Sequence, residues 1–164
     1  MEGIRIRRVE KDKWGYRALL LLADEQEDMI ARYLERGTMY VLELCGEGRA
    51  DGEGGEKADA AAAECVVTDE GNGVLELKSL AVRPGHQGKG YGRALIEFLE
   101  KEYGGSHEVL QAGTGESPRT VPFYEKCGFT YSHRIPDFFT KNYDHPIVED
   151  GVLLKDMVYY RRRL

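Results

Sequence analysis

The chain has 164 residues, of which 41% are hydrophobic and 32% charged, and a formal net charge of −6. This length fits one compact domain, and the negative charge argues against a nucleic-acid surface, because phosphate contacts need a basic patch. No apolar run approaches the roughly 20 residues of a membrane helix, and no signal peptide is visible. We therefore predict one domain over residues 1–164, in the cytoplasm, with neither nucleic acid nor membrane as a partner.

The cysteines and the basic tail carry no recognisable binding motif. Cys45, Cys65 and Cys127 lack metal-ligand spacing, so we expect reduced thiols and no metal site. Cys127 also lacks a basic partner at a spacing that would activate it as an acyl carrier. The basic cluster at residues 161–163 is interpreted as a solvated end of the chain.

The first part of the chain predicts strands around two short helices. Residues 14–37 are good helix formers interrupted by the acidic run 24–28, which predicts a break between two helices. Residues 46–63 are mainly Gly, Ala and acidic residues without a large apolar side chain. We expect a mobile loop there, because such a segment buries little apolar surface. Alternating or apolar runs predict strands at Ile4–Val9, Met39–Cys45 and Glu64–Thr68.

The second part alternates predicted strands and helices. Asn72-Gly73 predicts a tight turn, and an apolar stripe that includes Leu95 and Leu99 predicts an amphipathic helix. Residues 135–146 show no periodicity, and we expect them to be irregular. The predicted strands are 74–82, 109–112, 129–133 and 152–160, the predicted helices are 90–103 and 120–127, and a turn at 149–151 joins Ile147-Val148 to the last strand.

A glycine-rich turn joins the predicted strand 74–82 to the predicted helix 90–103. Its sequence is Gln87-Gly88-Lys89-Gly90-Tyr91-Gly92. Glycines let a ligand approach the main chain, and the unpaired N–H groups and macrodipole at the start of a helix favour an anion. The turn is therefore predicted to bind a phosphate or pyrophosphate.

Two familiar nucleotide loops fit this turn poorly. A P-loop has GxxxxGK followed by Ser or Thr, whereas Gly85 lies only three residues before Gly88 and Gly90 stands at the hydroxyl position. The dinucleotide fingerprint has GxGxxG and an acid after the next strand, whereas this turn has GxGxG and the next strand ends in residues 111–113, Gln-Ala-Gly. A nucleotide-binding module is kept as an alternative.

Two motifs together resemble those of the GNAT superfamily of acetyl-CoA-dependent N-acetyltransferases. One is Gln-x-x-Gly-x-Gly at residues 87–92, behind Leu-Ala-Val-Arg-Pro at 80–84, and the other is Tyr-x-x-x-Gly-Phe at 124–129. The resemblance covers residues 3 to about 133. It implies a mixed α/β fold with about six to seven strands, flanking helices and splayed central strands.

The same resemblance implies a function. An acetyl group would pass from acetyl-CoA to a primary amine of a small molecule or peptide, by direct attack in a ternary complex and without a metal. A homodimer is compatible with it, and a CoA-binding module without turnover is the alternative.

The resemblance places the cofactor on the strand end and the turn. The main chain of Leu80 and Val82 would bind the pantetheine arm, and the N–H of Val82 would stabilise the oxyanion. Lys89 and Arg93 would add positive charge or form ordinary surface, and Ser117 stands where the family commonly has an Asn that contacts CoA. The predicted cofactor-binding residues are Leu80, Ala81, Val82, Gln87, Gly88, Lys89, Gly90, Tyr91, Gly92, Arg93, Ser117 and Phe123.

The resemblance and the strand period supply the other catalytic candidates. Tyr124 would protonate the leaving thiolate, with packing against the cofactor as the alternative. Glu76 is the predicted base, because a period of two places it on the same strand face as Leu80; pairing with a cation at the surface is the alternative. His133 and Asp137 are further candidates for the base.

The acceptor is expected between the helices of residues 14–36 and the segment 132–144. The acidic run 24–28 and nearby aromatic residues would suit a cationic amine, and an ordinary solvated helix surface is the alternative for the acids. Aminoglycosides, polyamines, amino acids and protein N-termini all stay open as acceptors. The aromatic residues are Tyr131, Phe138, Phe139 and Tyr143.

Overall fold

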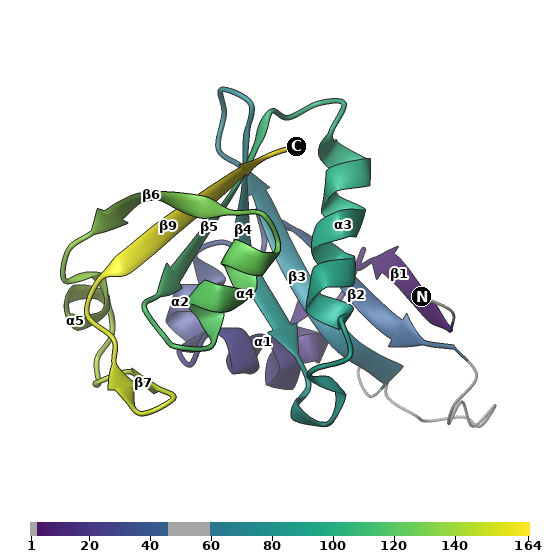
Figure 1. Ribbon diagram of the computed structural model, residues 1–164. Helices are drawn as coiled ribbons and strands as arrows, with labels where there is room; N and C mark the ends of the chain where they lie inside the picture. Colours follow the sequence, from purple (N-terminus) through teal and green to yellow (C-terminus); the bar gives the residue numbers. More distant parts are fainter. Residues whose placement is uncertain (1–2, 46–59) are drawn as a thin grey trace. The chain divides into compact units, whose positions relative to one another are not determined.

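A computed structural model describes residues 3–45 and 60–164 of the chain. The elements form a mixed α/β fold with a seven-stranded sheet of order β1-β2-β3-β4-β5-β9-β6 and a separate pair β7-β8 (Figure 1). The predicted fold class is confirmed, and the main sheet has the predicted six to seven strands, with β7 and β8 additional to it. The chain divides into unit 1, Met1–Thr68 with Lys78–Glu102, and unit 2, Asp69–Leu77 with Tyr103–Leu164.

The helices and strands have the following bounds. Up to the third α-helix they are β1 (Ile4–Arg8), η1 (Lys13–Tyr16), α1 (Arg17–Ala23), α2 (Glu27–Ala31), β2 (Thr38–Leu44), β3 (Ala61–Asp69), β4 (Val74–Val82), η3 (Pro84–His86) and α3 (Tyr91–Tyr103). They continue with β5 (Val109–Gly115), α4 (Thr120–Lys126), β6 (Thr130–Ile135), α5 (Phe138–Asn142), β7 (Val148–Glu149), β8 (Val152–Leu153) and β9 (Met157–Arg163).

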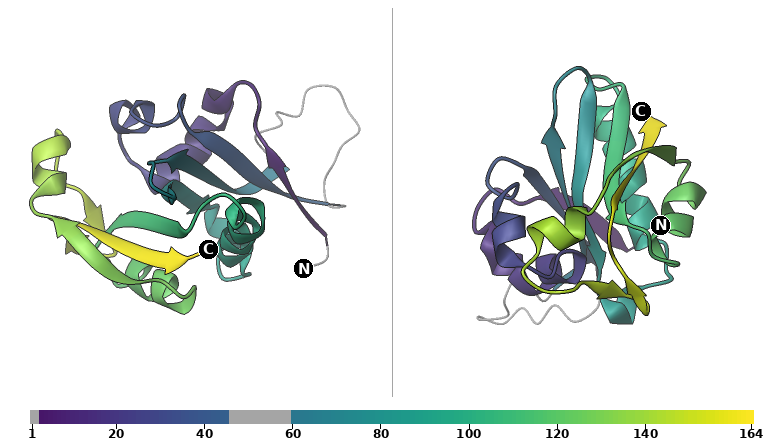
Figure 2. Two further views of the ribbon diagram at one scale, coloured as in Figure 1. Left: turned by 90° about the horizontal axis from the view of Figure 1, so that it is seen from above. Right: turned by 90° about the vertical axis from the view of Figure 1, so that its left-hand side faces the viewer.

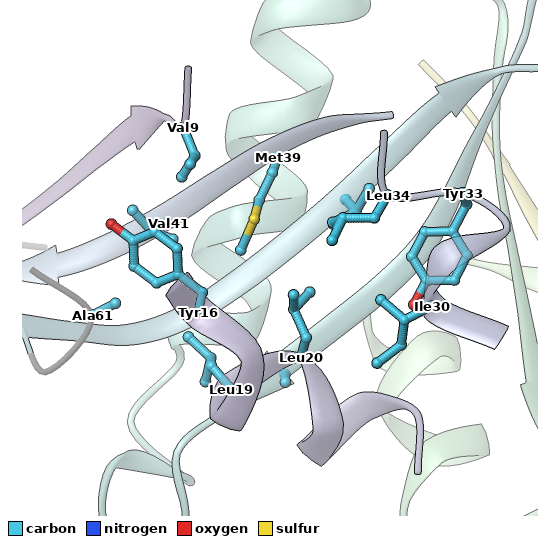
Figure 3. Packing of buried hydrophobic residues seen from close by; sticks show 12 residues of the cluster. Val9, Tyr16, Leu19, Leu20, Ile30, Tyr33, Leu34, Met39, Val41 and Ala61 are labelled. Carbon is cyan, nitrogen blue, oxygen red and sulfur yellow. The ribbon is translucent and has the colours of Figure 1, made fainter. Parts of the chain in front are cut away.

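In unit 1, strand β2 is covered by helices on both faces. Met39 and Val41 are buried in one cluster with side chains of α1 and α2 (Figure 3). Tyr40 lies between them in sequence and points to the other face, where its ring meets Phe98 of α3 at 4.9 Å between centroids. The period of two along a strand produces this division. The buried layer on each face fixes β2 and its neighbours as a rigid base for the turn after β4.

In unit 2, strand β9 lies between β5 and β6 and runs antiparallel to both (Figures 1 and 2). Tyr159 has Gly113 of β5 as its partner on one side and His133 of β6 on the other. The tail is therefore an inner strand of this unit. Residues 161–163 form the end of β9, and Arg161 and Arg163 are exposed there, as the interpretation of a solvated end predicts.

The ladder between β4 and β5 is short. It is parallel and runs from the pair Val74–Val109 to the pair Leu77–Ala112. Strand β4 nevertheless continues to Val82 and β5 to Gly115.

Most predicted elements of the first part are confirmed. The two short helices are separated at residues 24–26, β4 has the predicted bounds, and Asn72-Gly73 forms the turn with φ of 54° and 77°. The predicted loop 46–63 is wrong at its end, because β3 begins at Ala61 and residues 61–63 are buried. Their small side chains pack against β2, where Ala63 pairs with Leu42. Residues 46–59 of the predicted loop lie outside the described residues.

Two predictions for the C-terminal part are wrong. Residues 135–146 contain α5, which forms because Phe139 packs on Ile147 and Leu154 in a small separate core. The predicted strand 152–160 is two strands instead. Strand β8 pairs with β7 around the predicted turn, and the chain then turns at buried Leu154 before β9 begins.

Candidate active site

The glycine-rich turn has the backbone conformation that its sequence predicts. Gly88 and Gly90 have φ of 78° and 85°, in the left-handed region that strains any residue with a Cβ. A Cβ on Gly88 would meet no atom within 4 Å, so the space beside this glycine is open. At the start of α3, the N–H of Ala94 donates a hydrogen bond to the carbonyl of Gly90 at 3.0 Å. The amides of the first helical turn have no intrahelical acceptor and can bind an anion.

Hydrogen bonds fasten this turn to the end of β4. The Gln87 side chain donates from Nε2 to the Val82 carbonyl at 3.0 Å. The N–H of Arg83 donates to the carbonyl of Ala62 at 2.9 Å, and its Nε donates to that of Ala61 at 2.6 Å. Gln87, predicted as a cofactor-binding residue, thus holds the peptide between Val82 and Arg83, which directly follows the peptide that carries the Val82 N–H.

The same bonds define the free edge of β4. Successive residues of a strand direct their main-chain groups to opposite edges. Because Arg83 bonds to β3, Val82 and Leu80 direct their N–H groups away from β3. Both side chains are half-buried, whereas Ala81 is buried in the core of unit 1. The main chain of Leu80 and Val82, which is predicted to bind pantetheine, therefore faces away from β3.

The charged residues near the turn differ in their contacts. Lys89 is exposed. Arg93 lies 3.3 Å from Glu97 one helical turn later, and both side chains are largely exposed. Of the other predicted cofactor-binding residues, Tyr91 is half-buried and Gly92 is buried at the start of α3. Lys89 is thus available to a bound anion, whereas Arg93 would have to leave Glu97.

In unit 2, Tyr124 is held among aromatic rings. Its side chain is buried on α4. Its ring meets that of Phe129 edge-on at 5.3 Å and stacks on that of Tyr160 at 6.4 Å between centroids. Phe123, half-buried, meets it at 5.2 Å. The phenol therefore has a fixed orientation, as a group that delivers a proton requires.

Ser117 holds the start of α4. Its Oγ accepts the N–H of Thr120 at 3.1 Å and donates to the Thr120 hydroxyl at 2.7 Å. This is a capping contact, in which a hydroxyl satisfies an amide of the first helical turn. The predicted contact of Ser117 with the cofactor would have to share a buried hydroxyl that already has these partners.

Glu76 belongs to a chain of three side chains within unit 2. It is only 6% exposed, so the alternative of a surface group is wrong. Gln111 donates from Nε2 to Glu76 Oε1 at 2.5 Å, and Arg161 donates from Nε to Gln111 Oε1 at 2.7 Å. The amide thus links the carboxyl to a guanidinium. Sequence reasoning missed Gln111 and Arg161, because their contact depends on the register of β5 against β9.

Glu76 and Tyr124 lie on opposite faces of the sheet in unit 2. Arg161 is opposite Gln111 and Tyr159 is opposite Gly113, whereas Tyr160 alternates with them. Tyr124 stacks on Tyr160, so α4 covers the face opposite to the one that holds Glu76, Gln111 and Arg161.

Tyr159 lies on the same face as Glu76. Burial, followed by the carboxyls of Glu76 and Glu70, raises the pKa of the Tyr159 hydroxyl to about 12.

The further candidates for the base have local partners. His133 is exposed, and its ring stacks on Tyr159 at 4.6 Å with planes 4° apart. Asp137 lies 3.6 Å from Lys155 and is 42% exposed. Both are surface groups, unlike Glu76.

The aromatic residues predicted at the acceptor divide into two sets. Phe139 is buried in the small core of unit 2, with Phe138 and Tyr143 packed against it. Tyr131 is 51% exposed and has the Arg134 guanidinium 5.7 Å from its ring centroid. Three of the four aromatic residues therefore stabilise the α5 region, and Tyr131 alone presents a largely exposed ring.

Sequence reasoning also missed a buried acid in unit 1. Glu64 of β3 is fully buried, and its Oε1 accepts a hydrogen bond from Ser79 Oγ at 2.6 Å. Its Oε2 has no hydrogen-bond partner in the described part of the chain. Burial raises the pKa of this carboxyl to about 8. A single acid inside the apolar run of residues 61–67 is the sequence signal for it.

Three further observations concern the residues that the structure describes. No helix within residues 3–45 and 60–164 has the length and apolar character needed to cross a membrane. In the same ranges, no three His, Cys, Asp or Glu side chains are grouped to hold a metal ion. The three cysteines are free, with Cys65 and Cys127 buried and Cys45 exposed.

Comparisons with known proteins agree with this geometry. Residues 35–131 match the family model of the acetyltransferase (GNAT) domain. The uncharacterized N-acetyltransferase YvbK of Bacillus subtilis is 31% identical over 160 residues, which are 96% of this chain and 95% of that protein.

Two solved structures of similar proteins contain the cofactor. A Bacillus subtilis acetyltransferase in complex with CoA is 31% identical, with a TM-score of 0.79 over 98% of this chain and 99% of that one. A GNAT family acetyltransferase from Elizabethkingia anophelis with acetyl-CoA bound is 26% identical, with a TM-score of 0.82 over 100% of both chains.

Proposed function

Because the chain belongs to the GNAT family of acetyl-CoA-dependent N-acetyltransferases, we propose that its two units act as one catalytic domain that acetylates a primary amine by direct attack. The chain is an acyltransferase, and acetyl-CoA is its cosubstrate. The observation that carries the assignment of residues is the end of β4, where a main-chain edge that faces away from β3, the glycine-rich turn and the start of α3 follow one another. The family match at residues 35–131 includes this region and Tyr124.

In this proposal unit 1 binds the cofactor mainly through its main chain. The pantetheine arm pairs with the edge of Leu80 and Val82, and the pyrophosphate lies on the amides around Gly88, Gly90 and Gly92. The N–H of Val82 donates to the thioester oxygen as negative charge develops there. A preorganised donor of this kind contributes about 2.7–4 kcal/mol to the transition state, and the Gln87 bond to the Val82 carbonyl holds the next peptide along the strand.

Unit 2 supplies the acid and the base. Glu76, directly or through water, takes the proton that the ammonium must lose before its nitrogen can attack. Tyr124 gives its proton to sulfur as the C–S bond breaks. Because the two side chains lie on opposite faces of the sheet in this unit, they would serve the incoming amine and the departing thiolate separately.

The proposal also covers the class of amine that accepts the acetyl group, the assembly of the protein and its location in the cell. The acids at the gap between α1 and α2 support a cationic small-molecule or peptide amine, although Glu27 pairs with Arg17. Exposed Tyr131 and Ile135 on edge strand β6 offer apolar surface to a second copy in a homodimer. Free thiols fit a reducing compartment such as the cytoplasm.

The test is a thiol-release screen of amines with acetyl-CoA, comparing wild type with Tyr124→Phe. We expect the variant to bind acetyl-CoA with a similar Kd in calorimetry and to lose about 100-fold or more in kcat, as loss of an acid predicts. Unchanged turnover would contradict the role of Tyr124. Saturating acetyl-CoA, at 100 times its Kd, should stabilise the fold by about 2.7 kcal/mol; stabilisation by ATP instead would favour a nucleotide-binding module.

A further inference from the structure

A buried acid lies beside the proposed acetyl-CoA-binding end of β4. Glu64 is 0% exposed and accepts one hydrogen bond, from the hydroxyl of Ser79 on β4 at 2.6 Å. Ser79 directly precedes Leu80 in the strand. The second oxygen, Oε2, has no partner in residues 3–45 and 60–164. A single hydroxyl therefore connects this carboxyl to the strand that would hold pantetheine.

The titratable groups around Glu64 are acids. Cys65 follows it in β3, and burial together with Glu64 holds the pKa of this thiol well above its usual value. Tyr33, from the turn after α2, is buried, and the Ser79 side chain lies near its hydroxyl, although the hydroxyl has no hydrogen bond of good geometry in the described chain. Burial and the carboxyls of Asp24 and Glu64 raise the pKa of Tyr33. Within residues 3–45 and 60–164, the groups that shift the pKa of Glu64 include no cation that would stabilise its ionised form.

We propose that neutral Glu64 is a positioning residue, which holds the acetyl-CoA-binding end of β4 through Ser79, and that loss of its proton weakens acetyl-CoA binding. The inference rests on the proposed role of Leu80 and Val82. It adds a residue of β3 that touches neither cofactor nor acceptor.

Loss of the proton is unfavourable because few hydrogen-bond donors surround the Glu64 carboxyl. A carboxylate offers several acceptor sites, and here Ser79 supplies the one hydrogen bond, so a buried negative charge would be poorly compensated. The negative charge would be compensated only if water entered or the Glu64 side chain turned. Either change disturbs the hydrogen bond from Ser79. The main chain of Leu80 then loses the support directly before it. Since burial raises the pKa of Glu64 to about 8, the change falls just above neutral pH, where Cys65 and Tyr33 keep their protons.

Calorimetric titration with acetyl-CoA between pH 7 and 9.5 tests the proposal. Acetyl-CoA is the probe because it has no free thiol that titrates in this range. For wild type we expect the affinity to fall by roughly two- to tenfold, the equivalent of one hydrogen bond, with a midpoint near pH 8. Glu64→Gln keeps an oxygen that can accept from Ser79 and cannot ionise, so its affinity should show no such fall.

Ser79→Ala is the second variant and removes the connection while leaving Glu64 in place. Its affinity should also lack the fall near pH 8, and it carries the test alone if Glu64→Gln does not fold. Circular dichroism at each pH separates loss of binding from loss of structure. An equal fall in wild type and both variants, or no fall in wild type, overturns this inference alone. Absence of acetyl-CoA binding at every pH contradicts the proposed function itself.

Discussion

Two buried glutamates, Glu64 in unit 1 and Glu76 in unit 2, have opposite surroundings. Glu64 in unit 1 accepts one bond from Ser79 and has an oxygen without a partner in the described chain. Glu76 in unit 2 accepts the Gln111 amide, which is itself bonded to the guanidinium of Arg161. The first set of contacts suits a neutral acid and the second suits a carboxylate that takes up a proton. Burial alone thus does not define the role of an acid, and the donors around it do.

The largest expected effect concerns stability and tests the neutral state of Glu64. A glutamate carboxyl in water has a pKa near 4.5, and burial raises the pKa of Glu64 to about 8 in the fold. The folded state therefore holds the proton more tightly, and this stability is complete below pH 4.5 and is lost as the pH rises to about 8. The slope in between is at most about 1.4 kcal/mol per pH unit.

Urea unfolding of wild type and Glu64→Gln at pH 5 and pH 8 measures this difference. We expect the free energy of unfolding of wild type to fall relative to the variant between the two pH values. Glu102→Gln, which changes an exposed acid, is the matched control and should follow wild type. Parallel behaviour of wild type and Glu64→Gln would mean that Glu64 is already ionised at pH 5.

The second prediction separates the two glutamates by activity. Glu76→Gln keeps the size of the side chain but cannot accept a proton, so kcat should fall about 100-fold or more, as for loss of a general base. Thiol release at saturating acetyl-CoA, with the amine found in the screen, measures it at pH 7. Glu64→Gln should retain far more activity there, because its wild-type acid is already neutral. Similar losses in the two variants would break the comparison.

The third prediction concerns the glycine-rich turn of unit 1. Gly88→Ala places a Cβ at φ of 78°, which costs roughly 1–2 kcal/mol. If the turn shifts to relieve this strain, the affinity for acetyl-CoA should fall by roughly 5- to 30-fold. Gly85→Ala is the control, because a Cβ there also meets no atom within 4 Å and the backbone has no positive φ. Equal binding by the two variants would remove Gly88 from the site.

The sequence predicted the features that depend on residues close together in the chain, and it missed those that depend on residues far apart. The turn at Gly88 and Gly90 and the helix that carries Tyr124 depend on residues close in sequence, and they were predicted. The link between Gln111 and Arg161 joins residues 50 apart and depends on the register of β5 against β9. No local pattern gives that register, so the sequence did not bring Gln111 and Arg161 together.

Two further misses have local causes. The helix α5 buries one aromatic residue, Phe139, against segments that follow it in sequence, and it therefore shows no helical period. Glu64 was not recognised because a lone acid in a strand usually faces solvent. Its burial depends on the helices α1 and α2, whose residues cover the same core as its neighbours in β3.

The smallest expected effect concerns the cation behind Glu76. Arg161→Met removes the guanidinium from Gln111 and leaves the amide and the carboxyl in place. Because Arg161 is largely exposed, its contribution is that of a solvated charge, and we expect kcat to fall by only about two- to fivefold. Arg163→Met, which removes an exposed cation from the end of the same strand, should leave kcat near that of wild type. An Arg161 effect as large as that of Glu76→Gln would show that the whole chain of three side chains, rather than Glu76 alone, sets the position and charge of the base.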